Sequence, residues 1–165
     1  MTMQILEQYM LEADRAFEQQ LYLEGKRYLE DALAEEPTYG KAHNHMGWLY
    51  LYHLDESEKA ELHLKLALKY AANYSAPYIH MSHLLFETGR FEELQILLDT
   101  AADVPGVPQS FLANEFGRLN EIQGRYTAAI KCYKEAVKWS LNEQEIAIVK
   151  DNINRCKNKR WFFLF

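Results

Sequence analysis

The segment FGRLNEIQGRYTAAIKCYKEAV, residues 116–137, decides how the chain folds. Its apolar residues recur three or four positions apart on both sides of Gly124, which is the spacing of amphipathic helices. Gly124 marks the turn between them, because glycine adopts backbone angles that other residues avoid. The segment is therefore predicted to form two packed helices joined by a tight turn.

This pattern returns along the chain about every 35 residues. The small residue Ala136 recurs as Ala101, Ala67 and Ala32, with steps of 35, 34 and 35 residues. Other rows keep the same step: Gly25, Ala60, Leu94 and Ala129; Ala13, Gly47, Ser82 and Gly117; Leu29, Leu64, Leu98 and Tyr133; Tyr22, Ser57, Phe91 and Tyr126; Gln20, Asp55, Gly89 and Gly124. Leu94 and Ser57 depart from the small and aromatic character of their rows. A fixed period of this length predicts stacked helical hairpins, in which small rows allow close approach and large rows fill the remaining space.

The fourth unit resembles the tetratricopeptide repeat. The family's small and aromatic positions are occupied by Gly117, Gly124, Tyr126, Ala129, Tyr133 and Ala136. Asn120 replaces the tyrosine of the family's first helix, and the closing proline remains only at Pro37. The resemblance implies an all-α, right-handed superhelical solenoid of four helix hairpins with a C-terminal capping helix.

One domain over residues 1–165 is expected. The four repeats are expected at about 6–39, 40–74, 75–109 and 110–143, and a capping helix with an apolar tail is expected over 144–165. Helices are expected near 4–19, 22–36, 41–53, 57–71, 76–87, 91–102, 110–122, 126–140 and 143–160.

Composition limits the classes of function. The chain is 48% hydrophobic and 25% charged, which is typical of a globular protein, and its two cysteines have no C-x-x-C spacing. No secretory signal or membrane span is recognised, so a cytoplasmic location is expected. The net charge is −6, with +3 on residues 144–165 and −9 on the rest. An acidic body disfavours nucleic acid as the partner, because phosphate contacts need clustered Lys and Arg.

The resemblance also implies a site. In this family the first helix of each pair lines a concave face that binds a peptide or a protein segment. By register, the predicted contact residues are Asn44, His45, Trp48, Tyr52, His80, His83, Phe86, Asn114 and Arg118. Aromatic rings with polar neighbours favour a binding surface, and asparagine can hydrogen-bond a peptide backbone. The alternative is that packing within the fold buries these rings.

One binding mode of the family does not fit. Chaperone-binding members hold a C-terminal carboxylate with lysine, asparagine and arginine at fixed places on successive first helices. Here the corresponding places carry Met10, Asp14, Ala76 and His80. The basic residues are missing and Asp14 would repel a carboxylate, so this clamp is not expected.

Neither metal binding nor catalysis is expected. His80 and His83 share a helical face, with His45 in the matching row of the previous unit, but the H-E-x-x-H pattern is absent. The histidines are interpreted as polar groove residues. Phosphate-binding and nucleophile motifs are also missing, so the sequence predicts a protein that is not an enzyme and needs no cofactor.

The chain closes with five apolar residues, Trp161, Phe162, Phe163, Leu164 and Phe165, behind a basic run. This tail can seal the capping helix, dock on a second copy in a homodimer, lie on a membrane surface or recognise a larger partner. A docked tail, on its own cap or on a second copy, is the hypothesis that we favour, and a membrane role is disfavoured. The sequence thus predicts a non-catalytic scaffold, adaptor or co-chaperone-like module. The alternative is a peripheral membrane or assembly factor that acts through the tail.

Overall fold

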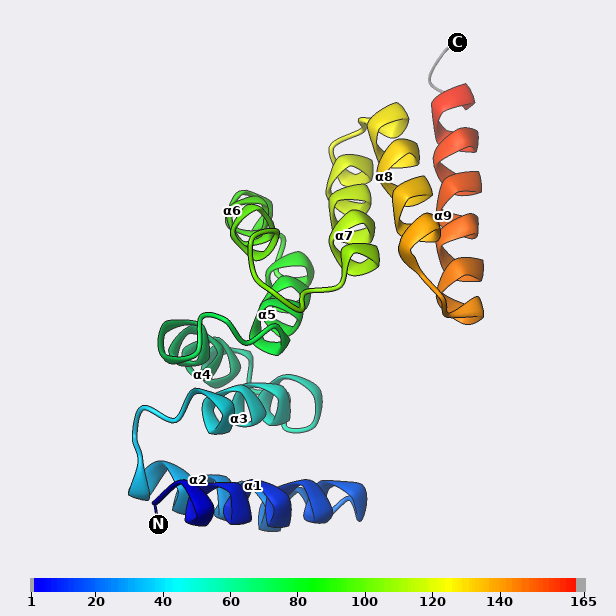
Figure 1. Cartoon of the computed structure of the whole chain (residues 1–165). Helices are drawn as coiled ribbons and strands as arrows, with labels where there is room; N and C mark the ends of the chain where they lie inside the picture. Colours follow the sequence, from blue (N-terminus) through cyan, green and yellow to red (C-terminus); the bar gives the residue numbers. More distant parts are fainter. Residues whose placement is uncertain (1, 163–165) are drawn as a thin grey trace. The chain divides into compact units, whose positions relative to one another are not determined.

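The computed structural model describes residues 2–162, which form α-helices and contain no strand (Figure 1). The helices are α1 (Thr2–Glu18), α2 (Tyr22–Glu35), α3 (Gly40–Tyr52), α4 (Ser57–Tyr70), α5 (Ala76–Glu87), α6 (Phe91–Ala101), α7 (Gln109–Ile122), α8 (Tyr126–Trp139) and α9 (Glu143–Phe162). Each begins and ends within two residues of its expected range. The all-α prediction is confirmed for the part of the chain that the structure describes.

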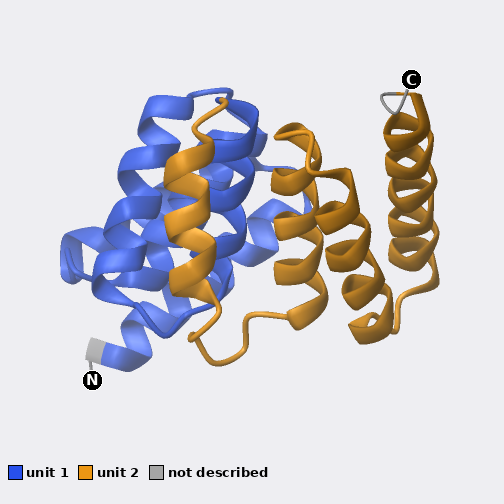
Figure 2. Ribbon diagram, turned by 90° about the horizontal axis from the view of Figure 1, so that it is seen from above, with its two compact units in different colours: residues 1–88 blue, residues 89–165 orange. Residues whose placement is uncertain are grey.

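The chain divides into two compact units, Met1–Thr88 and Gly89–Phe165 (Figure 2). In unit 1, the hairpins α1–α2 and α3–α4 stack through α2 and α3, and α5 contacts both α3 and α4. In unit 2, α6 contacts α7, the hairpin α7–α8 follows, and α9 packs on α8. Consecutive helices therefore stack in order within each unit. The boundary falls inside the expected third repeat, and a single domain over 1–165 stays a prediction.

The hairpin turns use one backbone conformation. Gln20, Asp55, Gly89 and Gly124 have φ of 61°, 53°, 69° and 73°. The same four residues form one of the rows that recur about every 35 residues in the sequence. The repeat period therefore identifies the residue of each turn that has a left-handed backbone conformation. Glycine adopts this conformation without steric cost, whereas other residues pay roughly 1–2 kcal/mol.

Replacing Gly124 by alanine is expected to lower the free energy of unfolding by about 1–2 kcal/mol. A Cβ at this position would meet nothing within 4 Å, so the loss comes from the backbone conformation and not from a clash. Urea denaturation followed by circular dichroism measures it. The matched substitution Asp55→Gly should have the opposite sign, and a destabilising Asp55→Gly would contradict the explanation.

The core lies where the rows of small and large residues meet. Ala32, Ala67, Ala101 and Ala136 are at most 1% exposed, and Leu29, Leu64, Leu98 and Tyr133 are fully buried. Between α3 and α4 the approach is so close that a Cβ on Gly47 would lie 2.6 Å from Leu64 Cγ. Packing therefore requires glycine at position 47.

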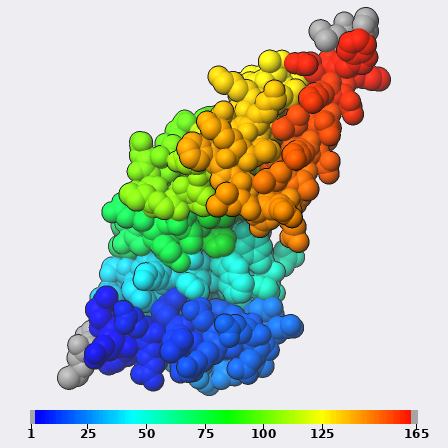
Figure 3. All heavy atoms as spheres, turned by 45° about the vertical axis from the view of Figure 1, so that its right-hand side comes forward, coloured from blue at the N-terminus to red at the C-terminus, as the bar shows by residue number. Residues whose placement is uncertain are grey.

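Helix α9 covers the apolar face of α8. Its residues Val149, Ile153 and Cys156 are buried in one cluster with Ile130 and Tyr133. Figure 3 shows the atoms of α8 and α9 in contact on the face that it displays. The cluster covers the outer face of the α7–α8 hairpin, as a capping helix does in stacked repeats.

The tail is described as far as Phe162. Trp161 and Phe162 belong to α9, and they are 67% and 79% exposed. The predicted docking residues Phe163, Leu164 and Phe165 lie outside the described residues, so docking of the tail stays a prediction. None of the described helices is long and apolar enough to cross a membrane.

Candidate functional site

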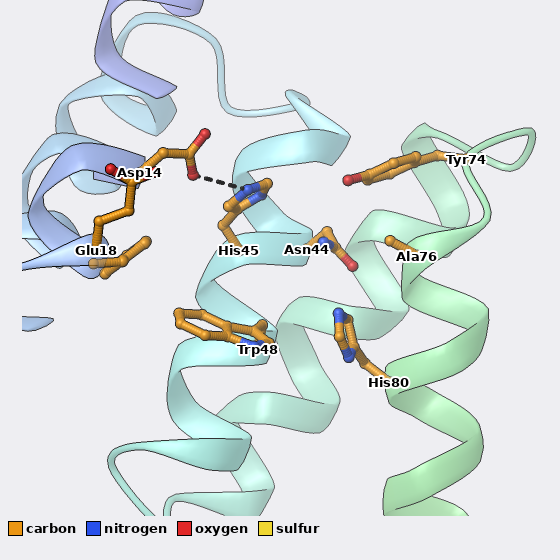
Figure 4. A pocket seen from close by; sticks show the side chains of 9 residues that line it. Asp14, Glu18, Asn44, His45, Trp48, Tyr74, Ala76 and His80 are labelled. Carbon is orange, nitrogen blue, oxygen red and sulfur yellow. Dashed lines mark ion pairs between the residues drawn. The ribbon is translucent and has the colours of Figure 1, made fainter. Parts of the chain in front are cut away.

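A pocket of about 560 Å³ opens in unit 1 between α1, α3 and the beginning of α5 (Figure 4). Its lining residues are Asp14, Phe17, Glu18, Asn44, His45, Trp48, Tyr74, Ala76 and His80. A second pocket of about 460 Å³ adjoins it and is lined by Glu7, Met10, Leu11, Asp14, Tyr39, Lys41, His45 and Tyr74. The two share Asp14, His45 and Tyr74, so they form one depression, which we call the unit 1 groove.

Helical spacing brings these side chains together. Asp14, Phe17 and Glu18 lie within about one turn of each other on α1, and Asn44 and Trp48 are one turn apart on α3. The first helices of the hairpins thus line the groove, as the register predicts. Of the predicted contact residues, Asn44, His45, Trp48 and His80 line it directly.

Trp48 is half-buried because other rings of unit 1 cover part of it. Its ring centroid lies 5.2 Å from Phe17 and 4.5 Å from His53, whose own ring stacks on Tyr22 at 4.1 Å. Trp48 nevertheless lines the pocket. The sequence leaves two interpretations open for this ring, burial within the fold and exposure on a binding surface. Trp48 is partly covered by neighbouring rings and also lines the pocket, so both interpretations apply.

A second ring cluster joins α3 and α5. The Tyr52 ring, 42% exposed, lies 5.6 Å from the His80 ring and 5.4 Å from the His83 ring. Burial, with smaller contributions from His45 and His83, lowers the pKa of His80 to about 4. His80 is therefore uncharged at neutral pH. Phe86, the last predicted contact residue of α5, is half-buried.

One side of the groove is acidic. Asp14 Oδ1 lies 3.3 Å from His45 Nε2, the contact drawn as a dashed line in Figure 4. His45 Nδ1 lies 2.9 Å from the Lys41 carbonyl oxygen and donates to it. Glu18 lines the same pocket, and Glu7 lines the adjoining one. A partner's carboxylate would be repelled here, which is the physical reason that the sequence already gives against the family's carboxylate clamp.

Asn44 is a deeply placed polar residue of the groove. Its side chain is 4% exposed, and its Oδ1 has no hydrogen-bond partner within residues 2–162. In Figure 4, Asn44 and His80 point toward one another from α3 and α5. A buried, unpaired amide oxygen is costly, so a donor supplied by a ligand would be stabilising.

The remaining two predicted residues belong to α7 in unit 2. Arg118 is held by Glu115 through Nη1–Oε contacts of 3.1 and 3.0 Å, and Glu115 is 4% exposed. Asn114 donates to the same carboxylate at 3.1 Å, and its own Oδ1 has no partner among the described residues. That Asn114 and Arg118 act together with the unit 1 groove stays a prediction.

Sequence reasoning missed part of this site. Tyr74 lies between α4 and α5, where no helical period applies, and nothing in the sequence pattern points to it. Outside the groove, the pattern does not single out His43 and His63, whose Nδ1 atoms are 3.0 Å apart between α3 and α4. Burial, with His43 and Lys26 nearby, lowers the pKa of His63 to about 4, so its ring is uncharged at neutral pH. Among residues 2–162, no group of three or more His, Cys, Asp or Glu is arranged to hold a metal ion.

The comparisons with known proteins match this architecture. Residues 113–143 match the family model of the tetratricopeptide repeat. No curated protein matches the chain in sequence. The solved structure of pilF from Pseudomonas aeruginosa is similar with a TM-score of 0.83 and 16% identity, covering 99% of this chain and 72% of that one.

Two further solved structures have the same fold. PilW, a widely conserved type IV pilus biogenesis factor, gives a TM-score of 0.77 at 19% identity, covering 94% of this chain and 76% of its own. A thermophilic tetratricopeptide-repeat protein of Thermus thermophilus gives 0.68 at 17%, covering 88% and 79%. The resemblance seen in the sequence is thereby confirmed: residues 113–143 match the tetratricopeptide repeat, and the described part of the chain has the fold of tetratricopeptide-repeat proteins.

Proposed function

We propose that the chain is a non-catalytic scaffold or adaptor that binds an extended segment of a partner protein in the unit 1 groove. Asn44, His45, Trp48 and His80 are the proposed central contacts. Tyr52, His83 and Phe86 are proposed as further contacts in unit 1, and Asn114 and Arg118 are proposed as contacts in unit 2. The two free cysteines support a reducing compartment such as the cytoplasm.

The main support for this proposal is the unit 1 groove itself. It is open, large enough for several side chains, and lined by a half-buried tryptophan beside an amide, two histidines and carboxylates. Tryptophan and tyrosine at the centre of a concave surface are among the side chains that contribute most to protein binding. The amide of Asn44 can pair with the backbone of an extended segment. A co-chaperone-like role based on carboxylate capture is less well supported, because Asp14 and Glu18 line the same pocket.

A pull-down from the native host, read by mass spectrometry, tests the proposal. The full chain is compared with the double variant Trp48→Ala, Arg118→Ala. We expect the double variant to lose the partner, with an affinity for the identified protein at least about 30-fold weaker, the size of a binding hot spot. Trp139→Ala is the matched control, because Trp139 is 55% exposed on α8 in unit 2. Undiminished capture by the double variant would contradict groove binding.

A second candidate function rests on the exposed end of α9. Trp161 and Phe162 are exposed large hydrophobic residues next to Lys159 and Arg160. Such a surface supports a peripheral membrane or assembly factor, or self-association through the tail. The same pull-down separates the two functions when a Trp161→Ala, Phe162→Ala variant is added. Loss of partners by this variant alone favours the tail, and loss by the groove variant alone favours the adaptor.

A further inference from the structure

The unit 1 groove has a strong charge bias. Glu7, Asp14 and Glu18 are spaced by seven and four residues on α1, which places them on one face of the helix, and all three line the groove. Among the described residues that line its two pockets, Lys41 is the one lysine or arginine. His80 adds no positive charge at neutral pH, because burial lowers its pKa to about 4. The groove therefore attracts a cationic group.

The pocket also holds acceptor atoms that the donors of a ligand can meet. Within the described part of the chain, Asn44 Oδ1 is buried without a partner, and the Asp14 carboxylate contacts His45. Asn44 and Asp14 line the same pocket, on opposite sides of His45 in Figure 4. Because the amide torsion of asparagine is broad, the oxygen of Asn44 can turn to meet a ligand. A ligand rich in N–H groups would supply donors to both acceptors.

Aromatic rings complete the pocket. Phe17 and Trp48 both line it, with their ring centroids 5.2 Å apart and their planes inclined by 58°. Cations are attracted to the faces of aromatic rings, most strongly to tryptophan, and a planar guanidinium can stack on them. Acidic groups, an unpaired acceptor and aromatic rings in one pocket all favour a cationic ligand with several N–H groups.

We infer that the unit 1 groove recognises an arginine or lysine side chain of the bound polypeptide. The cation lies between Asp14 and Glu18 on α1 and Asn44 on α3, with its stem along Trp48. Arginine fits better than lysine, because its five N–H groups reach several acceptors at once and its plane stacks on a ring. This inference rests on the proposed function and specifies the chemistry of the partner.

Selection from a phage-displayed library of random short peptides tests the inference without knowledge of the natural partner. The full chain is used as bait, beside an Asp14→Asn, Glu18→Gln variant. The matched control is Asp31→Asn, Glu35→Gln, which makes the same charge change with the same spacing on exposed positions of α2 outside both pockets. We expect peptides selected by the full chain and by the control to share an Arg or Lys at one position. The groove variant should lose this preference.

A second measurement quantifies how much the positive charge of the peptide contributes to binding. The best selected peptide is compared with its citrulline version, in which a neutral group of nearly the same shape replaces the guanidinium. The full chain should bind the citrulline peptide about tenfold or more weakly, as expected for a charge-assisted contact in a partly buried pocket. The groove variant should bind the two peptides equally.

The outcomes separate the inference from the function on which it rests. Selected peptides without a basic position, equal binding of the citrulline peptide by the full chain, or a basic preference that persists in the groove variant would each overturn the inference and leave groove binding intact. Failure to select any peptide above background would overturn groove binding itself, and the inference with it.

Discussion

Replacing Leu64 by alanine is expected to lower the free energy of unfolding by about 3 kcal/mol, within the range of roughly 2–5 kcal/mol for buried leucines. Leu64 is fully buried on α4 and packs directly over Gly47 of α3. The truncation removes apolar contacts and leaves a cavity between two helices that cannot close, because their backbones already approach closely at Gly47. Urea denaturation of the full chain measures the change.

Leu62→Ala is the matched control on the same helix. Leu62 is 57% exposed, so its truncation should change the free energy of unfolding by less than about 0.5 kcal/mol. The difference between the two variants tests whether burial decides the cost. Similar losses for both would contradict the packing that is described for the α3–α4 hairpin.

Leu64 also illustrates what the sequence could predict. It belongs to the row Leu29, Leu64, Leu98 and Tyr133, whose period of about 35 residues marks the positions between packed helices. The row predicts burial because every hairpin repeats the same geometry, and a position that packs in one unit packs in the others. Even Leu94, a large residue in a small row, is fully buried. Position in the repeat therefore predicts burial for small and large residues alike.

The site was predictable in position and less so in its contacts. The register placed Asn44, His45, Trp48 and His80 on the groove, because helix period alone decides which face a residue occupies. Which rings cover Trp48 depends on the spacing between hairpins, and one sequence does not give that spacing.

Arg118 shows a signal that sequence reasoning left unused. Its register predicts a contact for a partner, whereas in unit 2 it pairs with Glu115, three residues earlier on α7. Opposite charges at this spacing on a helix are neighbours, so the pair could have been anticipated from the sequence. An arginine held by a carboxylate that is 4% exposed has less of its charge to offer a partner. The acidic side of the unit 1 groove is for this reason the better guide to the partner's chemistry.

The second large effect is expected at Glu121, which joins α9 to the hairpin α7–α8. Glu121 is 7% exposed and accepts hydrogen bonds from three side chains of unit 2. Arg155 donates from Nε and Nη2 at 2.7 and 2.8 Å, Lys159 from Nζ at 2.9 Å, and the hydroxyl of Tyr133 at 2.9 Å. Burial alone would raise the pKa of Glu121, but the donors from Arg155, Lys159 and Tyr133 outweigh it and lower the pKa to about 2.

The lowered pKa of Glu121 decides how the stability of the fold changes with pH. A carboxyl whose pKa is 4.5 in the unfolded chain and about 2 in the folded one stabilises the fold above pH 4.5. The stabilisation is lost as the pH falls from about 4.5 to about 2, because protons then bind the unfolded chain first. The difference between the two pKa values corresponds to roughly 3 kcal/mol.

Glu121→Gln is therefore expected to lower the free energy of unfolding at pH 7 by about 2–3 kcal/mol. The hydrogen bonds that a charged carboxylate accepts become bonds to a neutral amide. In addition, an amide N–H then faces the donors of the neighbouring side chains. The variant should also lose the part of the acid-side pH dependence that Glu121 supplies. Urea denaturation of both proteins at a series of pH values between about 7 and about 2 measures both effects.

Glu135→Gln controls for the removal of a negative charge in the same unit. Glu135 pairs with Lys138 on the surface of α8, its side chain is 50% exposed, and such pairs contribute about 0–1 kcal/mol. The gap in stability between wild type and Glu121→Gln should shrink toward about pH 2, whereas Glu135→Gln should follow the wild type at every pH. A gap for Glu121→Gln that stays constant over the whole range would mean that the carboxylate is not the charged link between α9 and the helices it covers.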